Sequence, residues 1–215
     1  MVCTKEGVAM KKVLLTAFEA FGEDALNPTE LILKELPDQL ANAVIMKVTL
    51  PVVYREAFET LKPLIDKHQP DVIMMLGLAG GRAKLSLERI AINLNDAALP
   101  DNQGNTLKEQ VIINESEDGI FSNLPLKTLL DVLHQAKVPS VISNTAGAYV
   151  CNDTMYRVLH YIKSKQLATL AGFVHVPYMP EQVLNKQAPS MDLELMVKGV
   201  RVMIERLVDG RGYDD

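Results

Sequence analysis

The chain has 215 residues, of which 48% are hydrophobic and 23% are charged, and its net charge is −5 with an isoelectric point near 5.4. This balance is typical of one globular α/β domain and argues against a nucleic-acid-binding protein. No apolar run reaches the ~20 residues needed to cross a bilayer, the N-terminus lacks the apolar stretch of a signal peptide, and only Cys3 and Cys151 provide thiols. We therefore expect a cytoplasmic protein that has neither a membrane nor a nucleic acid as its partner.

The N-terminal segment predicts an extension and then a buried strand that ends at two phenylalanines. Residues 1–9 carry no hydrophobic periodicity, and we expect them to be a disordered extension of a single α/β domain at 10–215. Residues 13–17 form a short apolar run, which is typical of a buried strand. Phe18 and Phe21 follow in a loop at the carboxyl end of that strand, where open α/β sheets bind ligands. A hydrophobic plug beneath the loop is the alternative interpretation of the two rings.

A helix, a strand and a second helix come next along the chain. Asn27 offers an N-cap and Pro28 a first helical position for the first of these helices. Residues 43–50 predict a strand. Residues 53–68 predict the second helix, in which Pro63 marks a kink or a restart.

The middle of the chain combines a central strand with a long alternating segment. Residues 72–76 are wholly apolar, as expected for a central strand, and a glycine-rich turn follows at 77–81. Such a turn can cradle a phosphate, but neither a Lys-Ser/Thr pair nor a GxGxxG spacing accompanies it. Residues 85–94 alternate, which predicts one strand with Glu88 on a mostly apolar face. A carboxylate there lies either in water at the strand end or buried with a His or Arg partner.

The rest of the chain predicts further strands and helices around Cys151 and His175. The expected elements are a short strand at 111–113, an acidic turn at 115–119, a helix at 124–136, a strand at 138–142, a helix from Cys151 to about 165, a strand at 170–177 and a helix that Ser190 caps and Gly210 ends. Strands and helices alternate throughout. We therefore predict a three-layer α/β/α sandwich with a mostly parallel twisted sheet.

Cys151 occupies a position that suits a nucleophile, because it follows a strand and a small-residue turn and lies in or near the first turn of a helix. Free backbone N–H groups and the positive end of the helix dipole favour a thiolate there. The same N–H groups can hold an oxyanion once the thiolate attacks a carbonyl. A small buried apolar residue is the alternative. No Cys/His cluster with metal-ligand spacing occurs in the sequence, so we expect no metal and no cofactor.

Of the four histidines, His175 alone lies near the end of an apolar strand, where a parallel sheet collects its functional groups. The other three lie on predicted helices: His68, His134 and His160. A Cys/His pair supplies a nucleophile and a proton donor for the leaving group, and a third group that holds the imidazole completes such a set. Glu88 is the best-placed candidate for this third group.

Two long segments carry a resemblance to a known family. Residues 77–93 read GLAGGRAKLSLERIAIN, and residues 145–156 read TAGAYVCNDTMY. Shorter segments add support: Phe18-x-x-Phe21-Gly22, Asn27-Pro28, LPDNQG at 99–104 and VHVP at 174–177. The two long segments resemble the glutamate and cysteine motifs of the pyrrolidone-carboxylate peptidases, also called pyroglutamyl peptidases type I. The likeness runs from about Met10 to the final helix.

The resemblance implies a fold, a reaction and a set of roles. The implied nucleophile, acid/base and third catalytic member are Cys151, His175 and Glu88, in that order. The implied pocket for the substrate ring includes Phe18, Phe21 and Val150. The implied fold is an α/β/α sandwich of the phosphorylase/hydrolase-like type, often assembled as a homotetramer and without a metal. The implied substrate is a peptide with an N-terminal pyroglutamyl lactam, which the enzyme removes by thiolate acyl transfer.

Five positions depart from the family's pattern. Ala17, Ala20, Glu23 and Leu78 replace a Gly, a Pro, a second Gly and a Gln that are common in the family. Ala98 occupies the place of an Arg next to the oxyanion region. The last departure bears on the catalytic rate, and it leaves the three implied catalytic residues intact.

Two other functions stay open on the residues alone. A non-catalytic protein that binds a lactam or a peptide on the same fold is the main alternative. A nucleoside phosphorylase-like enzyme is a weaker one, since the glycine-rich turn at 77–81 can in principle hold a phosphate.

Overall fold

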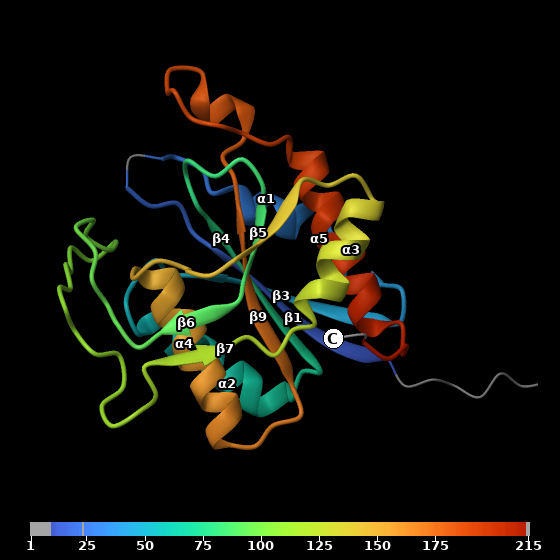
Figure 1. Cartoon of the computed structure of the whole chain (residues 1–215), viewed down its shortest axis with the longest axis horizontal. Coiled ribbons are helices and arrows are strands. Elements are labelled where there is room, and N and C mark those ends of the chain that lie inside the picture. Colours follow the sequence, from blue (N-terminus) through green and yellow to red (C-terminus); the bar gives the residue numbers. More distant parts are fainter. Residues whose placement is uncertain (1–9, 23, 214–215) are drawn as a thin grey trace, which may run out of the picture.

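A seven-stranded sheet with helices on both faces forms the centre of the computed structural model, which describes residues 10–22 and 24–213 (Figure 1). Its strand order is β2-β3-β1-β4-β9-β5-β8. These strands are β1 (Lys11–Phe18), β2 (Gln39–Leu40), β3 (Ala43–Leu50), β4 (Val72–Leu78), β5 (Leu85–Glu88), β8 (Ser140–Ser143) and β9 (Leu170–Val176). The expected extension at 1–9 lies outside the described residues.

The sheet is mostly parallel, and three strands run the other way: β5 and β8 near one edge, and the short β2 at the other, where it pairs with β3. Strands β1, β3, β4 and β9 are parallel to one another. Strand β5 pairs with β9 in the antiparallel sense, and β8 is parallel to β5. The three-layer α/β/α sandwich predicted from the alternation of strands and helices is confirmed.

Five helices cover the two faces of the sheet, with α1, α3 and α5 on one face and α2 and α4 on the other (Figure 1). Their bounds are α1 (Pro28–Glu35), α2 (Glu56–His68), α3 (Leu126–Gln135), α4 (Val150–Ser164) and α5 (Leu193–Val208). A short 3₁₀ turn, η1 (Pro180–Val183), precedes α5. Each face has its own apolar core, and the core beneath α2 and α4 includes Phe18, Val150 and Phe173. Among the helices of the described residues, none combines the length and apolar character that a bilayer crossing requires.

The long alternating segment at 85–94 does not form one strand. It divides at Arg89 into β5 and β6 (Ile90–Ile92), and β6 leaves the main sheet to pair with β7 (Gly119–Phe121). The expected strand at 111–113 is absent from the described structure. The Asn93 side chain hydrogen-bonds both the N–H and the C=O group of Ile113, so these groups do not pair with a neighbouring strand. The strand forms instead at the end of the expected acidic turn. Alternation continues through the division, so the pattern alone does not reveal it.

Side-chain caps mark the starts of α1 and α5. The Asn27 side chain accepts a hydrogen bond from the backbone N–H of Thr29, as expected of an N-cap. Helix α2 begins at Glu56 rather than at residue 53, and it continues through Pro63 without a restart. The last helix is capped by Asp192 and not by Ser190, which lies two residues too early. Both differences move a boundary and leave the expected element in place.

Candidate active site

Glu88 and His175 meet on the sheet face that α2 and α4 cover. Glu88 ends β5 and lies opposite Phe173 of the antiparallel strand β9, two residues before His175. The Glu88 side chain is fully buried, and its Oε1 lies 2.8 Å from Nδ1 of His175. Two alternatives were open for the Glu88 carboxylate, exposure to water at the strand end or burial with a partner. The structure shows it at the strand end, buried and paired with His175.

Arg82 is a second partner of Glu88, for which the sequence predicted a His or Arg partner without indicating this residue. Its guanidinium lies 2.5 Å from Glu88 Oε1 and donates another hydrogen bond of 2.9 Å to the backbone oxygen of Thr145. The Arg82 side chain is 30% exposed, so it reaches from the protein surface to the buried carboxylate. A buried charge needs a compensating partner, and this requirement at Glu88 was the signal that pointed to an arginine.

Cys151 lies at the N-terminus of α4, packed against the glycine of a neighbouring strand. A Cβ placed on Gly77 of β4 would lie 3.0 Å from Cys151 Sγ and 2.7 Å from a ring atom of Phe173. Gly77 is paired with His175 across β4 and β9. The ring of Phe173 lies 4.8 Å from the imidazole, centroid to centroid. Gly77 therefore makes the room in which the thiol, the imidazole and the Phe173 ring come together.

Burial controls the protonation of the thiol and the imidazole. Desolvation, reinforced by the Glu88 carboxylate, raises the pKa of Cys151 to about 12, although Arg82 and a backbone N–H oppose this rise. Desolvation also lowers the pKa of His175, against the opposing effect of Glu88. At Cys151 the loss of hydration therefore opposes the thiolate that the helix N-terminus favours.

The N-terminus of α4 presents free backbone donors beside the thiol. Tyr149 is the N-cap and makes no side-chain capping bond, while the first backbone bond of the helix runs from Asp153 N to Tyr149 O. The N–H groups of Val150, Cys151 and Asn152 thus have no acceptor in the helix itself. Such N–H groups can stabilise an oxyanion that forms at Cys151.

The three residues expected to wall the substrate pocket all lie on the side of the sheet that carries Cys151. Phe18 and Val150 are buried in the apolar core of this face, and the ring centroid of Phe18 lies 6.3 Å from that of Phe173. Phe21 is partly buried, 6.2 Å from the ring of Tyr149. Phe173 and Tyr149 were not predicted as site residues, although each lies two residues from an expected catalytic residue.

The histidines that lie on helices make contacts of their own. His134 Nε2 lies 3.3 Å from the backbone oxygen of Ser140, and the backbone oxygen of His68 accepts a bond from Lys12. His160 stacks on Tyr156, with 6.4 Å between the ring centroids. Among the residues at 10–22 and 24–213, no group of three or more His, Cys, Asp or Glu side chains is arranged to hold a metal ion.

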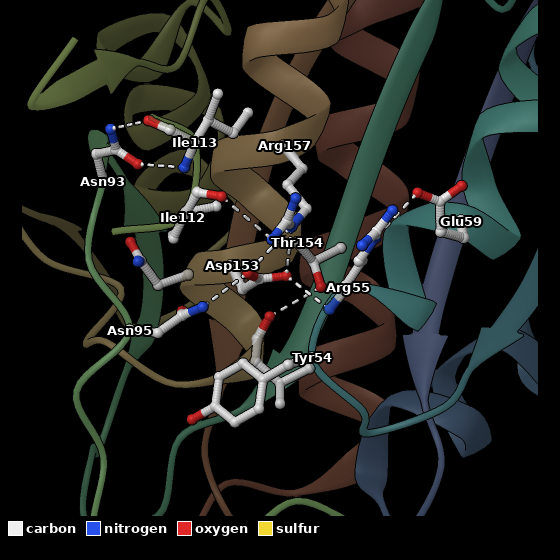
Figure 2. A network of polar contacts seen from close by, with 12 residues as sticks. Tyr54, Arg55, Glu59, Asn93, Asn95, Ile112, Ile113, Asp153, Thr154 and Arg157 are labelled. Atoms are coloured by element: carbon white, nitrogen blue, oxygen red, sulfur yellow. Dashed lines mark hydrogen bonds and ion pairs between the residues drawn. The ribbon is translucent and has the colours of Figure 1, made fainter. Parts of the chain in front are cut away.

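A buried polar network holds the start of α4 against the chain around it. Figure 2 shows Asp153, which is fully buried, among three donors from different segments. It accepts hydrogen bonds from the backbone N–H of Arg55 at 3.0 Å, from Asn95 Nδ2 at 2.9 Å and from Arg157 Nε at 3.0 Å. Arg55 has a φ of +64°, an unfavourable conformation for arginine that this bond helps to hold. The network fixes the helix turn that carries Cys151.

Position 98 lies in a loop that is tied to the same helix. Ala98 is exposed, and the backbone N–H groups before it bond to fixed partners: Asp96 donates to Ala148 O at 2.9 Å and Ala97 to Leu107 O at 3.1 Å. The loop is thus attached to the chain three residues before Cys151. Leu78 ends β4 and is buried.

Comparison with known proteins gives one consistent result. The family model described as pyroglutamyl peptidase matches residues 11–209. The chain is 44% identical over 205 residues to the pyrrolidone-carboxylate peptidase of Thermosipho africanus, which covers 95% of this chain and 99% of the relative, and 45% identical over 194 residues to that of Thermococcus onnurineus, which covers 90% and 97%.

Solved structures agree with the sequence comparisons. The pyroglutamyl peptidase I of Bacillus amyloliquefaciens superposes with a TM-score of 0.90 at 35% identity, covering 94% of this chain and 96% of that one. A mutant pyrrolidone carboxyl peptidase of Pyrococcus furiosus gives a TM-score of 0.89 at 40% identity, covering 93% and 99%.

Proposed function

Because the chain belongs to the pyroglutamyl peptidase family, we propose that it is a cysteine peptidase that removes an N-terminal pyroglutamyl residue from peptides. The observation that carries the mechanism is the buried contact between Glu88 and His175, beside a strand glycine that makes room for the Cys151 thiol. Glu88 accepts the Nδ1–H of His175, since an ionised carboxylate only accepts hydrogen bonds. This leaves Nε2 of the imidazole free to take a proton.

The first step is the attack of sulfur on the pyroglutamyl carbonyl carbon. As the S–C bond forms, the thiol proton passes to Nε2 of the neutral His175, and the carbonyl π electrons move to oxygen. The oxyanion accepts hydrogen bonds from the free N–H groups at the start of α4. Proton transfer during the attack suits a thiol whose pKa is about 12, because no thiolate needs to be present beforehand.

The second and third steps release the two products. The oxyanion collapses, the C–N bond breaks, and His175 gives its proton to the leaving amine. A water molecule then attacks the thioester while His175 takes its proton, and the collapse of this second oxyanion expels the Cys151 sulfur, which recovers the proton. Pyroglutamate leaves, and the thiol and the imidazole return to their neutral forms.

Recognition of the substrate depends on a neutral ring. A pyroglutamyl lactam carries no α-ammonium group, so the site needs apolar walls rather than a carboxylate. Phe18, Phe21 and Val150 supply such walls on the sheet face that carries Cys151. The neighbouring Phe173 ring extends the same apolar surface toward His175.

Assembly and location belong to the same proposal. We expect a homotetramer built from one α/β domain at 10–215 and working in the reducing cytoplasm. The support for the compartment is that Cys151 is a free thiol on which the proposed reaction depends.

The direct test is release of a fluorogenic amine from its pyroglutamyl conjugate. The wild type should release the amine, and Cys151→Ala should release none while it keeps the wild-type unfolding transition. Tight binding of pyroglutamate without release of amine by the wild type would favour the binding-only alternative. Equal release by the wild type and Cys151→Ala would contradict the proposed nucleophile.

A further inference from the structure

One row of residues crosses the sheet at the level of His175. Gly77 of β4 and Ser86 of β5 lie directly opposite His175 on its two sides. Val141 of β8 lies beside Ser86, and the register of β1 with β4, which pairs Thr16 with Met75, puts Phe18 level with Gly77 when it is continued by two residues. Residues paired in this way point their side chains to the same face of a sheet. The row therefore lies on the face that α2 and α4 cover.

The proposed reaction has a direction along this row. Phe18, at one end, belongs to the walls proposed for the pyroglutamyl ring. The Cys151 thiol lies over Gly77, and His175, which protonates the leaving amine, comes next. An extended substrate that passes from the ring pocket to the thiol and then to the imidazole continues over β5 and β8.

A groove lies where that continuation leads. It has a volume of about 390 Å³, within the range of roughly 300–1,000 Å³ for small-molecule sites. Its lining residues are Arg82, Ala83, Lys84, Ser86, Val141, Ile142 and Ser143. Ser86 and Val141 belong to the row, so the groove begins one strand spacing from His175. Among the strands that the structure describes, β8 is the last of the sheet, so none of them closes the groove on its outer side.

The size of the groove suits a short peptide. Neighbouring strands are ~4.8 Å apart, so the two spacings from His175 to Val141 amount to about 10 Å. An extended chain advances roughly 3.3–3.6 Å per residue, and this distance takes about three residues. The leaving peptide of the proposed reaction begins at His175 and needs a path of this kind.

The charges of the groove are of one sign. None of its lining residues is acidic, and it has two cationic side chains, Arg82 and Lys84. Arg82 is already paired with the buried Glu88. Lys84 is exposed, and within the described residues it takes part in no salt bridge. Its ammonium group can therefore pair with a bound carboxylate.

We propose that this groove binds the first two or three residues of the leaving peptide and favours a peptide that carries a carboxylate there. The proposal rests on the pyroglutamyl peptidase function proposed above. It gives that enzyme a preference on the far side of the scissile bond, which recognition of the pyroglutamyl ring cannot provide.

The test compares two amidated peptides that differ only in the second residue after the scissile bond: pyroglutamyl-Ala-Glu-Ala amide and pyroglutamyl-Ala-Lys-Ala amide. The wild type should cleave the glutamyl peptide with a kcat/KM about three- to fivefold higher, the effect of one exposed ion pair. High salt should reduce this ratio. Lys84→Glu should reverse it, and the ratio is insensitive to a general loss of activity. Lys198→Glu, an exposed charge reversal on α5 behind the sheet, is the matched control and should keep the wild-type ratio.

A pyroglutamyl conjugate of a fluorogenic amine separates the two proposals. If the conjugate is hydrolysed but the wild type cleaves the two peptides with equal kcat/KM values, the groove assignment is wrong and the proposed function stands. The same holds if Lys84→Glu leaves the ratio of the two kcat/KM values unchanged. Failure to hydrolyse the conjugate and both peptides would overturn the proposed function, and the groove assignment with it.

Discussion

Removal of the Arg82 charge tests how the buried carboxylate is sustained. Arg82→Met keeps most of the side-chain volume and leaves the fully buried Glu88 with His175 as its one remaining partner among the contacts described. Removing one partner of a buried ion pair destabilises a protein by about 3–5 kcal/mol. Because Arg82 is 30% exposed and the His175 contact persists, we expect a smaller loss than this, about 2–3 kcal/mol in the free energy of unfolding.

The same substitution should move the pH profile of kcat/KM. The Arg82 charge lowers the pKa of both Cys151 and His175, although it is not the largest influence on either. Its removal raises both pKa values, so the whole profile should shift to higher pH. Arg82→Lys keeps the charge and should keep the wild-type position of the profile, even if it loses the bond to Thr145 O.

Urea unfolding at pH 7 and a pH series of kcat/KM measure the two effects. Arg89→Met is the matched control, since Arg89 adjoins Glu88 in sequence but is exposed. In a double-mutant cycle, Arg82→Met should destabilise a Glu88→Gln background by much less than the wild type. An Arg82→Met protein that loses less than about 1 kcal/mol and keeps the wild-type pH profile would refute the idea that Arg82 sustains the buried carboxylate.

Three further predictions concern the space, the protonation and the oxyanion region of the site. Gly77→Ala places a Cβ 2.7 Å from a ring atom of Phe173. We therefore expect the free energy of unfolding in urea to fall by ~1–3 kcal/mol and kcat to decrease. Gly212→Ala is the control, because its Cβ would meet nothing within 4 Å, and it should show neither effect. Folding lowers the pKa of His175. As the pH falls below ~6.5, His175 therefore takes up a proton in the unfolded chain before it does so in the folded protein. The free energy of unfolding should then decrease by up to about 1.4 kcal/mol per pH unit until the folded pKa is reached. His175→Gln should remove this part of the slope, and an unchanged slope would contradict the assignment. Ala98→Arg should change kcat by less than about tenfold, roughly 1.4 kcal/mol, because the backbone N–H of residue 98 can donate to an oxyanion equally well whether the residue is alanine or arginine. If the wild type were inactive and Ala98→Arg restored its activity, the arginine side chain would be needed.

The sequence by itself determined the features that depend on neighbours along the chain. Residues 43–50 were predicted as a strand, and β3 has the same bounds, because an apolar run between turns carries that information locally. The capping role of Asn27 and the position of Cys151 at a helix start were likewise local. The positions of Glu88 and His175 near strand ends followed from the same patterns, and the family resemblance indicated the same residues.

Only the tertiary structure decided which of these groups meet and what their surroundings do to them. Alternation predicts which side of a strand is buried, but it carries neither the partner of that strand nor its direction, so the reversal of β5 and β8 was not foreseeable. Glu88 and His175 are 87 residues apart along the chain, and Arg82 reaches the same carboxylate from a turn. A thiolate at Cys151 was expected from its helix terminus, and desolvation of the sulfur acts against it. Desolvation depends on all the atoms that several distant segments pack around the thiol, and those atoms are brought together only when the chain has folded.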